Sequence, residues 1–153
     1  KMMVYTILFS VMGLILILLM YDWMHFPIAG SIWNMFIDIV LLVLASESVG
    51  IFIIGLLPVP RLALSVGALY SVMAFSMSGF TLPVETMPPY MQGLAEMFPL
   101  RHYFLFYSRE VIFGTGFAGW WQEAMHLLTF MILPSFVMYR LKRAYIYQNF
   151  PKK

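Results

Sequence analysis

Residues 78–116 of the chain read SGFTLPVETMPPYMQGLAEMFPLRHYFLFYSREVIFGTG, and this stretch decides the fold. It separates two long apolar runs and contains prolines at positions 83, 88, 89 and 99. Because proline lacks an N–H and disfavours helix in the residue before it, no single helix can cross this stretch. Two short helices are predicted instead, at about 89–98 and 99–113, each opening on a proline that a first turn tolerates. Gly114 and Gly116 are expected to end the second.

The second short helix is amphipathic, with Arg101, His102 and Arg109 on one arc and mostly aromatic residues on the other. At a rise of about 1.5 Å per residue it is roughly 20 Å long, shorter than the roughly 30 Å hydrocarbon core of a bilayer. It therefore cannot cross a membrane. We expect it to lie in the interface or to enter the bilayer part-way.

The composition places the chain in a membrane. Of its 153 residues 62% are apolar and only 10% are charged, whereas soluble domains carry about 25% charged residues. The chain has no cysteine, which excludes disulfides, thiolate metal sites and a cysteine nucleophile. The formal net charge of +2 does not suggest a nucleic-acid partner. The chain has no phosphate-binding glycine loop, so it cannot itself bind ATP, and nothing indicates another cofactor.

Four apolar runs are long enough to cross a bilayer. They lie at about 2–21, 32–57, 62–82 and 118–139, with an outer helical hairpin at 83–117 and a basic tail at 140–153. The predicted fold is an all-α integral membrane protein with two short re-entrant or interfacial helices between the third and fourth spans. No repeat or linker divides residues 1–153, so we expect one membrane domain. Since Lys1 leads directly into an apolar run, the chain is expected to be a piece of a longer protein.

Lysine and arginine predict the orientation. With four spans, both termini and the short turn at 58–61 lie on one side of the membrane. That side carries seven of the basic residues: Lys1, Arg61, Arg140, Lys142, Arg143, Lys152 and Lys153. The positive-inside rule therefore predicts cytoplasmic termini and an outer hairpin at 83–117. The basic tail should lie against anionic lipid.

Asp38, Glu47 and His126 are ionisable residues that fall inside predicted spans. A charge at mid-membrane costs on the order of 3 kcal/mol, so each should face protein or water, or be neutral. Asp38 and His126 lie at similar depths, about 9 Å and about 12 Å below the outer end of their spans, which predicts that they approach each other. Asn34, one turn before Asp38, could join them. Glu47 has only small polar candidates at its depth, among them Thr6. A hydrogen-bonded spot that helps helices associate and a lining of a transport path are both open interpretations.

Small residues predict where helices approach each other closely. Ala63, Gly67 and Ser71 share one face of the third run, and Ser46 and Gly50 do the same on the second. In lipid, small residues at this spacing let helix backbones come into contact. Pro134 is expected to kink the fourth span.

Catalytic patterns are weak. Ser78-Gly79 together with His126 is similar to the pairing of a membrane serine protease, but helical depth separates the two side chains. The three histidines, at positions 25, 102 and 126, are scattered along the chain, which argues against a metal site. We therefore predict no catalytic and no metal-binding residue, and an intramembrane enzyme is a minor alternative.

The sequence from Ser78 onward, SGFTLPVETMP, resembles the end of the fifth span in type-2 ATP-binding-cassette exporter permeases. That family has Ser-Gly-Phe-x-x-Pro-x-x-x-Met-Pro, then two short outer helices, the second opened by a Pro-Leu pair. Pro99-Leu100 matches the pair, and Gly114 or Gly116 matches the glycine that ends this helix. The motif residues are Ser78, Gly79, Pro83, Glu85, Met87, Pro88, Pro99 and Gly114. Glu47 and the Arg109-Glu110 step depart from the family pattern.

The resemblance implies that the four runs are the third to sixth spans of a six-span permease. Such permeases form homodimers or heterodimers, bind a cytoplasmic ATPase subunit and move substrates outward across the cell or inner membrane. The hairpin at 83–113 would then form the outer gate, and the 62–82 span would contribute to the dimer interface and the path. A membrane scaffold or channel subunit without an ATPase partner is the main alternative.

Overall fold

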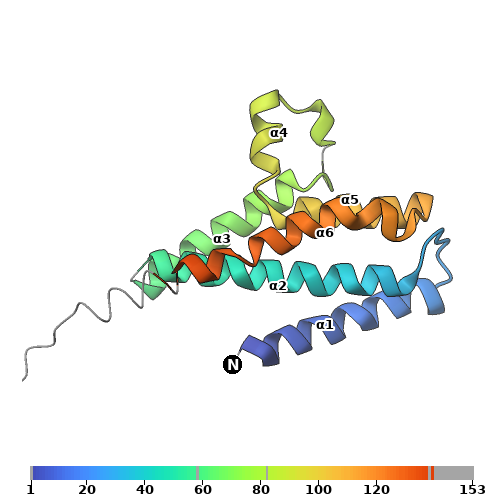
Figure 1. Ribbon diagram of the computed structural model, residues 1–153, viewed down its shortest axis with the longest axis horizontal. Coiled ribbons are helices and arrows are strands. Elements are labelled where there is room, and N and C mark those ends of the chain that lie inside the picture. Colours follow the sequence, from blue (N-terminus) through green and yellow to red (C-terminus); the bar gives the residue numbers. More distant parts are fainter. Residues whose placement is uncertain (1, 58, 82, 138, 140–153) are drawn as a thin grey trace, which may run out of the picture.

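The computed structural model describes residues 2–57, 59–81, 83–137 and 139, and within these residues it is helical and has no strand. The predicted basic tail at 140–153 lies outside the described residues. An elongated bundle is formed by α1 (Met2–Leu18), α2 (Ile32–Leu56), α3 (Pro60–Met77), α5 (Pro99–Phe113) and α6 (Gly116–Phe130) (Figure 1). The predicted all-α class is confirmed.

Among the described residues, three helices are long and apolar enough to cross a membrane: Met2–Trp23, Ile32–Leu56 and Pro60–Met77. In the first, α1 continues through a π-helical turn at Leu19–Trp23. Large apolar side chains are exposed along all three helices. A surface of this kind is suited to lipid rather than to water.

The fourth run is helical but interrupted. Helix α6 ends at Phe130, a turn occupies 131–132, and helix resumes over 133–137. Pro134 explains the break, because a proline ring clashes with the carbonyl four residues earlier, here that of Phe130. The kink expected at Pro134 is therefore present. A complete fourth crossing over 118–139 stays a prediction.

The two short helices of the hairpin differ in where they lie. Helix α5 packs lengthwise against α6 and α2, whereas α4 (Pro89–Ala95), with the 3-10 turn η2 (Val84–Thr86), projects from the side of the bundle (Figure 1). The first helix had been expected to reach Phe98, but it ends at Ala95. Helix α4 exposes Tyr90 and Leu94, and the position of the hairpin on the outer side stays a prediction.

The start and end of α5 fix its depth. Phe98, which precedes α5, packs on Tyr70 with ring centroids 5.1 Å apart, about midway along α3. At the other end, Val111 accepts a hydrogen bond from the backbone N–H of Ala29 in the α1–α2 connection. Helix α5 therefore runs from the middle of the bundle to one end, and its re-entrant or interfacial position in the membrane stays a prediction.

Candidate functional site: the hairpin and its contacts with α2, α3 and α6

The motif at the end of α3 is a locally bonded turn. The Ser78 hydroxyl is fully buried and donates to the carbonyl of Phe75 at 2.7 Å. Gly79 has φ +101°, and a Cβ there would lie 3.1 Å from the Phe104 ring of α5. Glycine is therefore needed both for its backbone angle and for the close approach of α5. The Ser78 hydroxyl thus serves the turn, which leaves no support for a serine–histidine catalytic pair.

The motif prolines begin elements. Pro83 precedes the η2 turn and accepts hydrogen bonds from Thr86, and Pro88 precedes α4, where its carbonyl accepts from the N–H of Met91 and Gln92. Pro99 is the first residue of α5 and is buried.

The remaining motif residues join or end these elements. Met87 and Glu85 offer their carbonyls to the Gln92 side chain, at 2.8 and 3.5 Å. The Glu85 side chain is exposed. Gly114 ends α5 in the left-handed region at φ +57°, where a Cβ would clash with the carbonyl oxygen of Ala29. Each of these residues shapes the hairpin, and their part in gating stays a prediction.

Glu110 fastens the end of α5 to the start of α2. Its carboxylate is buried and accepts hydrogen bonds from the backbone N–H of Ser31 at 2.9 Å and from the Asn34 amide at 2.8 Å. The first N–H groups of a helix have no partner within the helix, and Ser31 provides no side-chain cap of its own. Glu110 thus caps α2 from a position 79 residues away, and a carboxylate also suits the positive end of the helix dipole.

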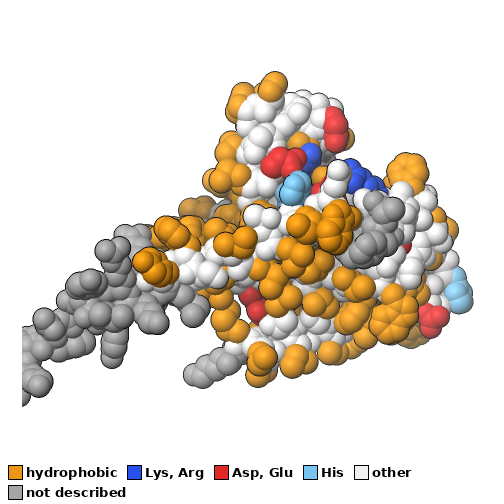
Figure 2. Space-filling view, viewed as in Figure 1, with side chains coloured by type: hydrophobic (Ala, Val, Ile, Leu, Met, Phe, Trp, Pro, Cys, Tyr) orange, Lys and Arg blue, Asp and Glu red, His pale blue; other side chains and the backbone are white. Residues whose placement is uncertain are grey.

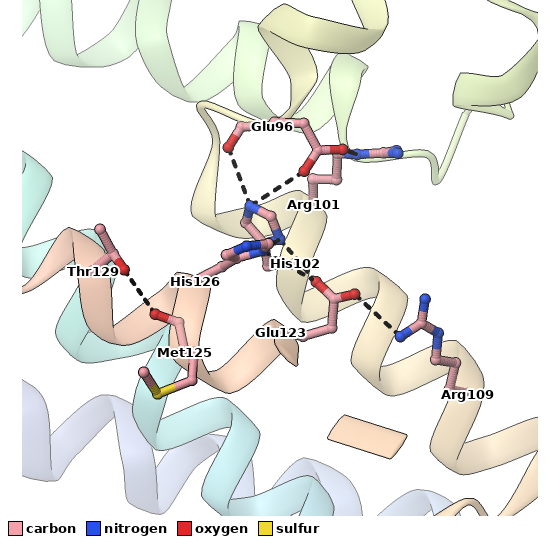
Figure 3. A network of polar contacts seen from close by, with 8 residues as sticks. All are labelled: Glu96, Arg101, His102, Arg109, Glu123, Met125, His126 and Thr129. Carbon is pink, nitrogen blue, oxygen red and sulfur yellow. Dashed lines mark hydrogen bonds and ion pairs between the residues drawn. The ribbon is translucent and has the colours of Figure 1, made fainter. Parts of the chain in front are cut away.

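A cluster of ionisable side chains joins α4, α5 and α6 (Figure 3). We call it the polar cluster; it consists of Glu96, Arg101, His102, Arg109, Glu123 and His126. At its centre the buried His102 ring lies between two acids. Its Nδ1 is 2.9 Å from Oε2 of Glu123, and its Nε2 is 3.1 Å from the backbone carbonyl of Glu96.

Each of the two acids, Glu96 and Glu123, forms an ion pair with an arginine. Arg101 Nε donates to Glu96 Oε1 at 2.8 Å, and Arg109 Nη1 lies 3.2 Å from Glu123 Oε1. Burial alone lowers the pKa of His102, but the hydrogen bonds to Glu123 and Glu96 and the charges of both carboxylates raise that pKa above its ordinary value. In Figure 2, acidic, basic and histidine side chains gather at the base of α4, on a surface otherwise rich in apolar side chains.

No hydrogen bond joins Asp38 to His126 among the described residues, and their predicted approach stays a prediction. Nδ1 of His126 instead faces Nδ1 of His102 at 3.2 Å and lies 3.8 Å from Glu123 Oε2. Asn34 likewise binds Glu110 rather than Asp38.

The two intramembrane acids differ in their partners. Asp38 is 2% exposed, and neither carboxylate oxygen has a hydrogen-bond partner among the described residues. Glu47 accepts a hydrogen bond from the Thr6 hydroxyl at 2.7 Å, which joins α1 to α2. Thr6 was among the small polar candidates expected for Glu47, and that expectation is confirmed.

The small-residue faces of α2 and α3 border a groove of about 620 Å³. Its lining includes Ser46, Gly50, Ala63, Gly67, Ser71, Ala74, Pro99 and Leu100. A Cβ added at Gly50 or Gly67 would meet nothing within 4 Å. At these glycines the expected close approach of helix backbones does not occur within the described part of the chain. Pro99 and Leu100, the first residues of α5, border this groove.

Sequence reasoning missed most of the polar cluster. Its central contacts, those of His102 with Glu123 and His126, span 21 and 24 residues. The available signal was Glu123, a third acid in an apolar run, one turn before His126. Because an acid and a histidine on one helical face need a polar partner in lipid, this pair indicated a contact from the hairpin.

Comparison with known families supplies the classification. Residues 1–113 match the model of the ABC-2 type transporter family. The chain belongs to the ABC-2 type transporter family. It is therefore a multi-pass membrane protein and part of a transport permease that is not itself catalytic. No curated protein and no solved structure matches the chain.

Proposed function

We propose that this ABC-2 chain is part of a permease that exports its substrate, driven by a separate cytoplasmic ATPase subunit, with residues 83–113 as the outer gate. One observation carries the gate: Pro99 and Leu100 of the re-entrant helix line the same groove as the small residues of α2 and α3. Any displacement of α5 along the bundle therefore changes the size of this groove.

The polarity of the hairpin supports a water-filled side of the bundle. The side chains of His126, Glu96 and Arg109 are 57%, 49% and 41% exposed within the chain. Ionisable groups within membrane proteins face the bundle interior or a water-filled cavity rather than lipid. We place the outward vestibule on this face, where α4 meets α5 and α6.

The groove between α2 and α3 supports a dimer. Its glycines are unfilled within the chain, and small residues at this spacing let a second helix approach closely. We propose that a second permease subunit, identical or related, packs here and that the path runs between the subunits. Both ends of this chain would lie in the cytoplasm, in agreement with the basic residues predicted on that side.

A labelling experiment tests the gate. The chain contains no cysteine, so Leu100→Cys introduces a single thiol where the hairpin borders the groove. In the full-length complex with its ATPase, we expect a membrane-impermeant maleimide to label this thiol at least about threefold faster or slower once nucleotide is trapped with vanadate. Asp22→Cys, at an exposed position outside residues 83–113, should label at a constant rate. Equal rates at Leu100→Cys in both states would contradict the gate.

Purification of the full-length protein from native membranes tests the ATPase partner. A co-purifying ATPase subunit supports the transporter, whereas its absence supports the scaffold or channel alternative. Replacing Pro83 and Pro88 by alanine should reduce export without releasing the ATPase. These prolines precede η2 and α4, in the hairpin that we propose lies opposite the cytoplasmic side.

A further inference from the structure

We propose that His102, His126 and Glu123 form a binding site for a divalent transition-metal ion of the zinc type, which joins the re-entrant hairpin to α6. The proposal rests on the polar cluster alone and does not depend on the gate. Two rings and one carboxylate supply two nitrogen donors and one oxygen donor. Imidazole and carboxylate are donors that zinc accepts, usually in a tetrahedral arrangement.

The spacing of the donor atoms fits such an ion. The Nδ1 atoms of His102 and His126 are 3.2 Å apart, and they lie 2.9 Å and 3.8 Å from Oε2 of Glu123. In a tetrahedron with bonds of about 2.0–2.1 Å, the donors are about 3.3 Å apart. The three separations bracket this value. The cluster thus already forms one face of the tetrahedron, and the fourth position is left for water.

The tautomer of His102 directs its free lone pair to this face. Nε2 faces only acceptors, the Glu96 carbonyl at 3.1 Å and the Glu96 carboxylate at 3.7 Å, so Nε2 carries a hydrogen. Nδ1 of the neutral ring is then bare and faces both a carboxylate oxygen and a second imidazole nitrogen. A proton on Nδ1 fills this position in the metal-free chain, and a cation would satisfy all three donors together.

Glu96 and Arg109 hydrogen-bond or pair with the proposed ligands and orient them, as the residues around the ligands of known metal sites do. Ligating histidines commonly donate their other N–H to a carbonyl or carboxylate, as His102 does to Glu96. Arg109 holds Oε1 of Glu123, which leaves Oε2 for the ion. Glu96, His102 and His126 also offer ligand atoms within 4.8 Å of one another. We assign the carboxylate ligand to Glu123 because it faces Nδ1, where the two rings meet.

Metal titration of the full-length protein in detergent tests the site. After removal of metal with a chelator, we expect one Co²⁺ per chain, the visible absorption of a four-coordinate ion, and displacement of Co²⁺ by Zn²⁺. Mg²⁺ should not compete, because it prefers six oxygen ligands. A protein that binds no Co²⁺, or binds it only in six-coordinate form, would overturn the proposal.

Variants assign the ligands. We expect His126→Ala, His102→Ala and Glu123→Gln each to weaken Co²⁺ binding at least about 100-fold, and Glu96→Gln by roughly 10-fold, as for an outer-shell group. The controls are His25→Asn, which suits the φ of 51° at that exposed position, and Glu85→Gln. Both should bind like the unmodified protein. His126 is exposed, so its variant is expected to fold. Unchanged binding in His126→Ala, or a larger loss in Glu96→Gln than in Glu123→Gln, would overturn the assignment.

Discussion

The two sides of α5 are built in opposite ways. Toward α6 and the start of α2, its side chains are paired: His102 with Glu123, and Glu110 with the first turn of α2. Toward the middle of α2 and α3, its first residues border a groove lined by small, mostly apolar side chains, with open space over Gly50 and Gly67. Within the described chain the first side is largely paired, although Oε2 of Glu110 has no hydrogen-bond partner there. The second has surface that nothing in the described chain fills.

This difference separates residues that hold the fold from residues that await a partner. A buried polar group left without its partner costs about 1–3 kcal/mol. A larger side chain that extends into open space changes the free energy of unfolding little. Substitutions on the paired side should therefore reduce the free energy of unfolding, whereas substitutions in the groove should change only what the protein does in its assembly.

The largest loss of stability is expected for Glu110→Ala. It leaves the Ser31 N–H and the Asn34 amide without their buried acceptor, at a cost of about 3 kcal/mol in the free energy of unfolding. Glu110→Gln keeps one acceptor oxygen and should cost about 1 kcal/mol. Denaturation of the full-length protein in detergent measures both. Glu85→Ala, at an exposed acid, is the control and should be neutral. A loss in Glu85→Ala equal to that in Glu110→Ala would show that Glu110 is not a cap.

The sequence predicted best those features whose causes act locally along the chain. Prolines and glycines act on their own backbone, so α5 begins at Pro99 and ends at Phe113 before Gly114, as predicted. The apolar runs likewise predicted α2 to within one residue, because hydrophobicity is summed along the chain. The break after Phe130 was expected from Pro134 for the same local reason.

The contacts between helices were harder to predict. Helical periodicity gives the depth and relative face of a residue but not the partner that its face meets. For this reason Asp38 was paired with His126, although His126 meets His102 instead. Asn34 and Glu110 are 76 residues apart, and no local pattern connects them. Glu47 was the favourable case, since few polar candidates such as Thr6 lie at its depth.

A smaller loss is expected for Thr6→Val. This variant keeps the shape of the side chain but removes the hydroxyl that donates to Glu47. Hydrogen bonds between membrane helices contribute about 0.6 kcal/mol on average, so the loss of stability should be about that size. Thr129→Val is the matched control, because the Thr129 hydroxyl bonds only to the carbonyl of Met125 in its own helix. If both variants lose the same stability, the Thr6–Glu47 bond does not join α1 to α2.

The smallest effect on stability is expected for Gly67→Leu, in the groove. A Cβ at this position meets nothing within 4 Å, so the folded chain has room for the larger side chain. We expect a change in the free energy of unfolding of less than about 0.5 kcal/mol. In the assembled transporter the same leucine would occupy the space proposed for the second subunit. The dimer fraction in mild detergent and the ATP hydrolysis of the complex should therefore both fall at least about fivefold. Gly93→Leu, an identical change on exposed α4 with open space over its Cβ, controls for added bulk.

If Gly67→Leu unfolds the chain, the groove is already filled by its own helices. If the variant leaves both dimer and hydrolysis intact, the open side of α5 is not the subunit interface.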